Sequence, residues 1–122
     1  MGLTQQIGAS GENHAAEFLK FKGFEVIFRN WRAGRYEIDI VAKDRRCLVF
    51  VEVKSRTRQR DTLFPEDKIN TGKQKKLFAA AQLYLEKFPH EGPVRFDVVS
   101  VISLPFSRRL YYHPDAFFPI GC

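Results

Sequence analysis

Two acidic side chains and one lysine stand inside apolar, strand-like segments, where charge is unexpected. Glu52 and Lys54 interrupt the valines of "LVFVEVKSR", and Asp39 lies between two isoleucines in "YEIDIVAK". Burying such charges without partners is costly, and a divalent cation such as Mg²⁺, which binds one or two carboxylates together with waters, offsets that cost. Two acids and an amine around a cation suit phosphodiester hydrolysis, in which the metal activates water and neutralises charge on phosphate.

A plainer interpretation of the same residues is the solvent-facing side of an amphipathic strand, ion-paired across to its neighbour. Residues two apart in a strand point to the same face. Glu52 and Lys54 therefore share one face of their strand. In the preceding strand, Asp39 is expected on one face, with Ile38 and Ile40 on the other.

Two polar residues on the predicted helices favour a pocket over the plainer interpretation. Gln74 extends the apolar stripe of the helix predicted over Gly72–Phe88 backwards by one turn, and Glu12 stands near the buried face of the first predicted helix. Each alone is typical of a satisfied polar residue at the edge of an element. Together with the charged strand residues, they predict a polar pocket where four elements meet.

Hydrophobic periodicity predicts a single mixed α/β domain over residues 1–122. Its helices and strands determine where the candidate residues lie. Only three residues join the second and third predicted strands, which must therefore be antiparallel neighbours. That pairing can bring Asp39 close to Glu52. The predicted helices run from Thr4 or Ser10 to Lys22 and over Gly72–Phe88, and the predicted strands are Phe24–Trp31, Tyr36–Lys43, Cys47–Lys54, Val94–Ile102 and an edge strand, Arg108–His113.

The spacing of the charged residues resembles a nuclease motif. Asp39, twelve intervening residues and then Glu52-Val53-Lys54 look like the PD-(D/E)xK motif. More closely, the chain resembles the YraN family, bacterial proteins inferred to be endonucleases and similar to archaeal Holliday junction resolvases. The resemblance runs from Gly8 to about Phe118 and implies a restriction-endonuclease-like fold, a central mixed sheet flanked by helices, with Mg²⁺- or Mn²⁺-dependent cleavage of DNA. It is carried by "GENHAAEFLKFKGFEVIFRNWRAGRYEIDIVAKD", "LVFVEVKSRT", "KQKKLFAAAQLYL" and "RFDVVSV".

The resemblance also implies a role for each candidate residue. Asp39 and Glu52 match the metal-binding acids of the motif, and Lys54 matches its catalytic lysine. Glu12 matches a first-helix glutamate of resolvase-like members, a metal or water ligand, and Gln74 falls where related nucleases place a supporting polar residue. Junction-cutting relatives work as dimers, so the resemblance leaves a homodimer open.

The charge balance favours an anionic partner, and nucleic acid above all. The formal net charge is +6 and the sequence pI is about 9.5. Basic residues concentrate after the motif, where they would supply salt-sensitive, largely sequence-independent affinity for phosphates. No reader of base edges is evident, which favours structure-selective action on branched or single-stranded DNA. The predicted nucleic-acid-binding residues are Arg56, Arg58, Arg60, Lys68, Lys73, Lys75 and Lys76.

The sequence also suggests where the protein works. Its N-terminal segment lacks the long apolar stretch of a signal peptide, and its apolar runs fall short of the roughly 20 residues that span a bilayer. The widely spaced Cys47 and Cys122, without CxxC spacing, favour a reducing compartment. A cytoplasmic protein without a membrane partner is therefore expected.

Two other functions and one residue stay open at this point. A nuclease-derived module would bind DNA or RNA without cutting it, and a protein-interaction domain would use the basic face to recognise an acidic partner. Asp97, in "RFDVV", either joins the polar pocket or pairs with Arg95 or Arg29.

Overall fold

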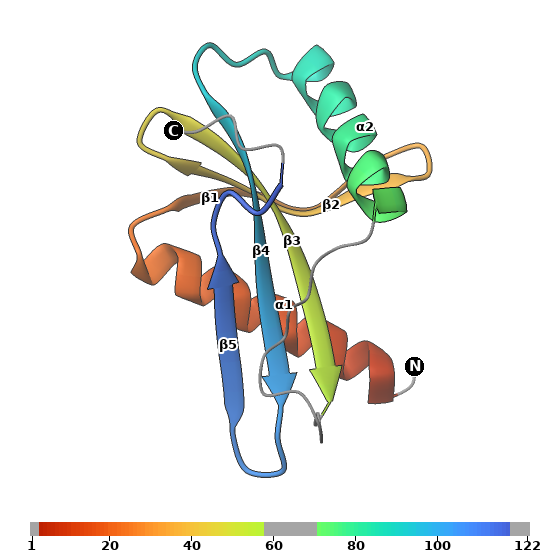
Figure 1. Ribbon diagram of the computed structural model, residues 1–122, viewed down its shortest axis with the longest axis vertical. Helices are drawn as coiled ribbons and strands as arrows, with labels where there is room; N and C mark the ends of the chain where they lie inside the picture. The colour runs from red at the N-terminus through yellow and green to blue at the C-terminus, as the bar shows by residue number, and fades with distance from the viewer. Residues whose placement is uncertain (1–2, 58–70, 118–122) are drawn as a thin grey trace.

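The computed structural model describes residues 3–57 and 71–117, with the side chains of 11–56 and 71–117 (Figure 1). Within these ranges every predicted helix and strand is present, in the predicted order. The third strand differs most at its end, because it continues to residue 57. The elements are α1 (Leu3–Phe21), β1 (Glu25–Ala33), β2 (Tyr36–Asp44), β3 (Cys47–Thr57), α2 (Thr71–Lys87), β4 (Val94–Ser103) and β5 (Arg108–His113).

The strands form one sheet in the order β1-β2-β3-β4-β5. β2 pairs antiparallel with β1 and β3, β4 pairs antiparallel with β5, and β3 and β4 are parallel. The tight turn at Arg45, which has a left-handed φ of 59°, returns β3 along β2 as predicted. The crossover that contains α2 instead lets β4 run parallel to β3. The predicted mixed sheet flanked by helices, a restriction-endonuclease-like α/β fold, is confirmed.

The sheet lies between the two helices, and each of its faces has its own core (Figure 1). On β3, Val49 and Val51 belong to the core under α1, whereas Phe50 belongs to the core under α2. All three side chains are fully buried, and burial of each stabilises the fold by about 1.5–3 kcal/mol. Strand alternation then places Glu52, two residues after Phe50, on the same α2 face.

Tyr84 packs α2 against two strands of the sheet. Its ring makes edge contacts with Phe28, Trp31 and Phe50, at centroid distances of 5.9, 5.2 and 5.4 Å. These rings come from β1 and β3, so one tyrosine links α2 to both strands. Such ring pairs favour a defined edge-on geometry in addition to burying apolar area. These contacts hold the C-terminal part of α2 against the sheet.

On the opposite face, α1 approaches the sheet closely at Gly11. A Cβ added there would overlap the Ser55 Oγ and would lie 3.1 Å from the Ser55 Cβ and 3.7 Å from the Val101 Cβ. The hydroxyl can rotate away but the Cβ cannot. We expect Gly11→Ala to lower the free energy of unfolding by about 1–2 kcal/mol, because overpacking outweighs the better helix propensity of alanine.

Urea denaturation checks this prediction. Glu17→Ala is the matched control, because the Glu17 side chain is exposed on the same helix and pairs only loosely, at 3.7 Å, with Lys20. The control should change stability by less than about 0.5 kcal/mol. Unchanged or increased stability of Gly11→Ala would show that α1 can move away from β3 without loss.

Neither helix is both long and apolar enough to cross a membrane, as judged over the described ranges. Cys47 is buried at the start of β3 and is not a free thiol. The cysteine spacing therefore gives no support to the reducing compartment that it favoured.

Candidate functional site

Asp39 lies at the point where β2 leaves β3. The pairing between the two strands covers Ile40–Asp44 of β2, so Asp39 is the first residue beyond it. Its Oδ2 accepts a hydrogen bond of 2.8 Å from the backbone N–H of Val53. The carboxylate thus takes the place of the backbone acceptor that β2 no longer offers to β3. At this position the Asp39 side chain, rather than the backbone of β2, accepts the hydrogen bond from β3.

Strict alternation of β2 is interrupted at the same place. Ile38 belongs to the core under α2, whereas Ile40 belongs to the core under α1. The prediction that these two isoleucines share one face is therefore wrong. The interruption directs Asp39 along the opening between β2 and β3 rather than onto one face of the sheet, which is why its side chain can reach the backbone of Val53.

Glu52 and Asp39 border the same pocket, as the hairpin pairing predicted. The pocket has a volume of about 190 Å³. Glu52 is only 6% exposed, and its Oε2 lies 2.8 Å from the Nζ of Lys73 on α2. That ion pair supports a buried charge, and it also raises the pKa of Lys73. The two acids that define the motif therefore converge on one small cavity.

The environment of Asp39 opposes its negative charge. Burial raises its pKa most, the charge of Glu52 raises it further, and the hydrogen bond from Val53 partly counteracts both. Glu12 and Glu37 raise it by smaller amounts, and the resulting pKa is about 7, against an ordinary value of 3.8. Asp39 is thus an acid with a pKa near 7 beside a second acid. A bound cation would stabilise the negative charges of both carboxylates.

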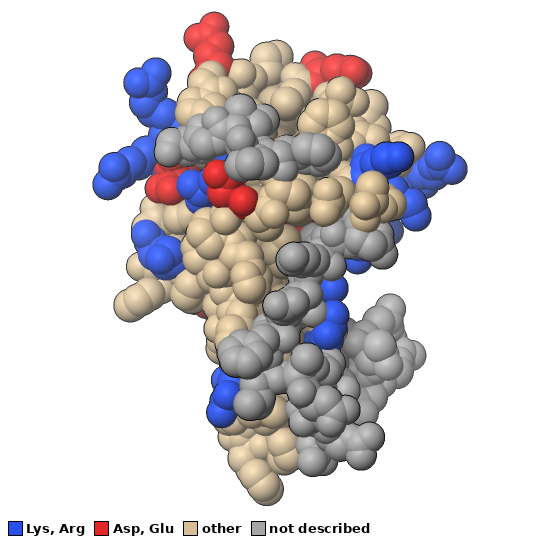
Figure 2. Space-filling model, viewed as in Figure 1, with Lys and Arg blue, Asp and Glu red and all other residues tan. Residues whose placement is uncertain are grey.

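Basic residues line the same pocket. They come from the β1–β2 turn and from the first two turns of α2: Arg35, Lys73 and Lys76. In Figure 2, lysines and arginines of this face form separate groups, one of them over the β1–β2 hairpin. The pocket therefore combines carboxylates inside with ammonium and guanidinium groups around them. The carboxylates suit a bound cation, and the basic groups suit a phosphate beside it.

Lys54 and Gln74 stand beside this pocket and not among the residues that line it. Lys54 follows Glu52 on β3, opposite Ser100 of β4, and is half-buried. Gln74 is half-buried in the first turn of α2, next to Lys73. The sheet and α2 thus bring both predicted residues to the neighbourhood of Glu52, with Lys73 in the more direct position.

Glu12 reaches the site from the other side of the sheet. Its carboxylate accepts hydrogen bonds from Asn30, at 2.8 Å, and from Arg29, at 3.2 Å. Its side chain is 12% exposed, and its charge contributes to the raised pKa of Asp39. Glu12 is therefore near Asp39 but is not among the residues that line the pocket.

The predicted nucleic-acid-binding residues fall into three groups. Lys73 and Lys76 line the pocket. Lys75 is exposed on α2, and Arg56 is half-buried near the end of β3. The remaining three lie outside the described residues: Arg58, Arg60 and Lys68.

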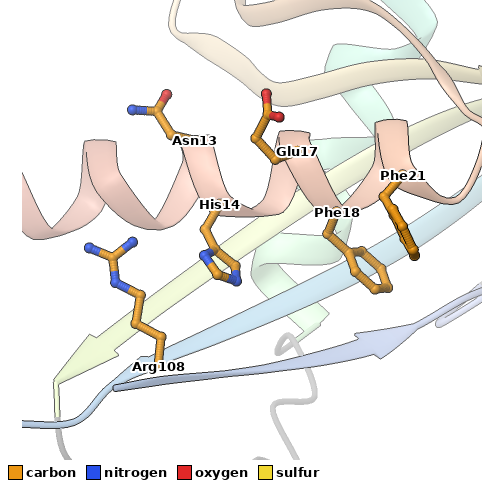
Figure 3. Close-up of a pocket in the computed structure, with 6 residues that line it drawn as sticks. All are labelled: Asn13, His14, Glu17, Phe18, Phe21 and Arg108. Carbon is orange, nitrogen blue, oxygen red and sulfur yellow. The ribbon is translucent and has the colours of Figure 1, made fainter. Parts of the chain in front are cut away.

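Asp97 does not belong to the pocket. It is fully buried on β4 and accepts hydrogen bonds of 2.8 and 3.0 Å from Arg95, so the structural interpretation of this residue is confirmed. A separate hollow of about 470 Å³ lies between α1 and β5, where His14 points toward Arg108 and the Phe18 ring lies farther along α1, beside Phe21 (Figure 3). It contains none of the predicted catalytic residues.

The donor set at the pocket fits a hard divalent cation that retains water. Within the described ranges, no three His, Cys, Asp or Glu side chains stand close enough to form a closed metal cage. Asp39 and Glu52 together offer two carboxylates, which is the number that Mg²⁺ commonly takes from a protein. The Lys73 ammonium against Glu52 shows that a positive charge is already accommodated there. The residues present therefore fit Mg²⁺ or Mn²⁺.

Sequence reasoning missed the partners of Glu12 and the rim residue Arg35. One signal was available for the partners, because the alternation of Phe24, Val26 and Phe28 is interrupted by the consecutive polar residues Arg29-Asn30. No comparable signal marks Arg35. Its place at the pocket depends on how the β1–β2 turn folds over the sheet.

Comparison with known proteins connects this site to a family. The sequence model of "Uncharacterised protein family UPF0102" matches residues 11–101, a segment that includes every predicted catalytic residue. A UPF0102 protein of Lawsonia intracellularis is 42% identical over 113 residues, covering 92% of this chain and 85% of that protein. One from Bacteroides thetaiotaomicron is 40% identical over 121 residues, covering 98% of each. One from Symbiobacterium thermophilum is 43% identical over 107 residues, covering 87% of this chain and 90% of that protein.

Proposed function

The chain belongs to the uncharacterised UPF0102 family, and from the geometry of its site we propose that it is a metal-dependent endonuclease that hydrolyses phosphodiester bonds in DNA. The observation that supports this most is the convergence of Asp39 and Glu52 on one small pocket with basic residues at its rim. We further propose structure-selective action, on branched or single-stranded DNA, since the rim offers charge rather than groups arranged to read bases.

Each residue of the site has a distinct task in this proposal. Asp39 and Glu52 would hold Mg²⁺ or Mn²⁺, which when bound lowers the pKa of water and neutralises charge on phosphate. Lys54 would orient the attacking water. Arg35 and Lys73 would hold the phosphate backbone against the pocket, since both line it.

Cleavage assays test the proposal. Purified protein is incubated with branched, nicked and single-stranded DNA, with Mg²⁺, Mn²⁺ or EDTA, and products are resolved on denaturing gels. We expect metal-dependent cutting that Glu52→Gln lowers by at least about 100-fold. Glu86→Gln, an exposed position on α2, is the matched control and should cut like wild type. No cutting of any substrate, or equal cutting by Glu52→Gln, would refute the enzyme.

Lys73 allows a prediction about metal binding itself. Its ammonium competes with a cation for Glu52, and at 54% exposure this competition is modest. We expect Lys73→Met to tighten Mn²⁺ binding by roughly fivefold, which corresponds to about 1 kcal/mol. Isothermal titration calorimetry measures the change, with the exposed neighbour Lys75→Met as control. Weaker Mn²⁺ binding by Lys73→Met would mean that the lysine assists the cation instead of competing with it.

The same ion pair favours a second candidate, a nuclease-like module that binds nucleic acid without cutting. In that case Lys73 would permanently neutralise Glu52, and the pocket would need no cation. The module would bind DNA in a salt-dependent way that survives Glu52→Gln, and calorimetry would detect no Mn²⁺ affinity. These two measurements separate it from the enzyme.

A further inference from the structure

The Glu12 carboxylate is braced by two consecutive residues of β1. The Asn30 Nδ2 donates to its Oε1 at 2.8 Å, and the Arg29 Nη2 donates to the same oxygen at 3.2 Å. Arg29 also donates to the Oδ1 of Asn13 at 2.6 Å, which ties the guanidinium to α1. Both donors from β1 use one oxygen, so Oε2 of Glu12 lies outside these two contacts.

The backbone of Asn30 has an unusual conformation that makes the brace feasible. Its φ is 54°, in the left-handed region that asparagine tolerates better than most residues. Along β1, Arg29 pairs with Ile40 and Trp31 pairs with Ile38, so Asn30 is the residue beside Asp39. The kink in β1 and the interruption of alternation in β2 therefore occur at the same place. There, one residue lies opposite Asp39 in the strand register and contacts Glu12 through its side chain.

Without such a brace, Glu12 would tend to leave the site. It is a flexible side chain with a negative charge near Asp39, and like charges at short range repel. Arg29 partly neutralises it, and the Asn30 amide sets its direction without adding charge. Hydrogen bonds to an ionised group are the stronger kind, so these two donors can hold a carboxylate where repulsion disfavours it.

We propose that Arg29 and Asn30 are positioning residues that hold Glu12 beside Asp39, so that its carboxylate acts on the cation site through water. This inference rests on the proposed function. It agrees with the absence of a three-carboxylate cage among the described residues, because Mg²⁺ keeps several waters that a nearby carboxylate can orient. Residues that orient groups around a metal commonly change its affinity by about 10- to 100-fold.

The test uses a substitution that retains the backbone conformation. Asn30→Gly tolerates the positive φ and removes the side chain that carries the carboxamide. We expect its Mn²⁺ dissociation constant to rise about 10-fold and cleavage to fall at least as much, while Tm falls measurably because the hydrogen bond to Glu12 is lost. Arg45→Gly, at another left-handed position away from the pocket, is the matched control and should bind Mn²⁺ like wild type. Wild-type Mn²⁺ affinity in Asn30→Gly would overturn the inference.

A double substitution shows whether Asn30 acts through Glu12. If it does, Glu12→Ala combined with Asn30→Gly should bind Mn²⁺ no more weakly than Glu12→Ala alone, whereas additive losses would overturn the inference. If wild type neither binds Mn²⁺ nor cuts DNA, the proposed function fails, and the same cycle is read from Tm. Non-additive Tm shifts would then uphold the brace alone, and additive shifts would overturn it as well.

Discussion

Asp39→Asn is expected to abolish metal-dependent DNA cleavage, with a loss of at least about 1,000-fold, while the protein still folds and binds DNA. Asparagine has the shape of the carboxylate and can still accept the hydrogen bond from the Val53 N–H. It lacks the charge that would hold the cation together with Glu52. Cleavage gels and DNA-binding titrations, compared at equal protein concentration, measure the two activities separately. Cleavage within tenfold of wild type would remove Asp39 from the active site.

The same substitution is expected to stabilise the metal-free protein at high pH. The pKa of Asp39 is about 7 when folded and 3.8 ordinarily, so the folded state binds more protons between these values. The stability that the protonated acid contributes is therefore fully present below about pH 4 and is lost as the pH rises through 7. An asparagine cannot ionise, so the variant escapes this loss.

Thermal unfolding in EDTA from pH 4 to 8 measures that difference. Wild type and Asp39→Asn should have similar stability near pH 4, and the variant should be more stable at pH 8 by on the order of 2 kcal/mol. Adding Mg²⁺ at pH 8 should stabilise wild type and leave the variant unchanged. A constant difference between the two proteins at all pH values would contradict a titrating Asp39.

Asp97→Ala is expected to cause the largest loss of stability, about 3–5 kcal/mol, which is a large share of the 5–15 kcal/mol typical of a domain. The fully buried carboxylate accepts hydrogen bonds from Arg95 at 2.8 Å, from the Tyr112 hydroxyl at 2.5 Å and from the Asp115 N–H at 2.9 Å. It raises the pKa of Arg95, chiefly through the hydrogen bond between them. Removing the Asp97 carboxylate leaves the guanidinium of Arg95, whose side chain is 12% exposed, without its main partner.

Urea denaturation of Asp97→Ala tests this, with Asp44→Ala as the matched control. Asp44 is the other acid beside Arg95, at 3.6 Å and with 34% of its side chain exposed, and its loss should cost less than about 1 kcal/mol. A similar loss in both variants would mean that Arg95 needs any nearby negative charge rather than the buried Asp97.

The order of elements and the β2–β3 hairpin could be predicted because they depend on local information. The alternation of Val49, Phe50 and Val51, the short turn at Arg45 and the single apolar stripe of α2 are all periodic or short-range. The same local rules paired the strand that carries Asp39 with the strand that carries Glu52. Local rules were therefore sufficient to predict that both acids belong to the candidate site.

The tertiary structure alone decided how those acids are used. Strict alternation failed at Asp39, because β2 leaves β3 there and the carboxylate takes over a backbone hydrogen bond. Lys73, predicted only as a contact for nucleic acid, pairs with Glu52 because α2 packs on the face of the sheet to which Glu52 points.

By itself, the sequence determined which residue types occur at which periodic spacing, and hence the α/β class and the pairing of two acidic strands. Only the folded chain decided the departures from periodicity: the left-handed Asn30, the diverging strands at Asp39 and the pKa of about 7. The physical reason is that a charge in a protein depends on burial and on neighbours distant in sequence. Periodicity describes neither of these.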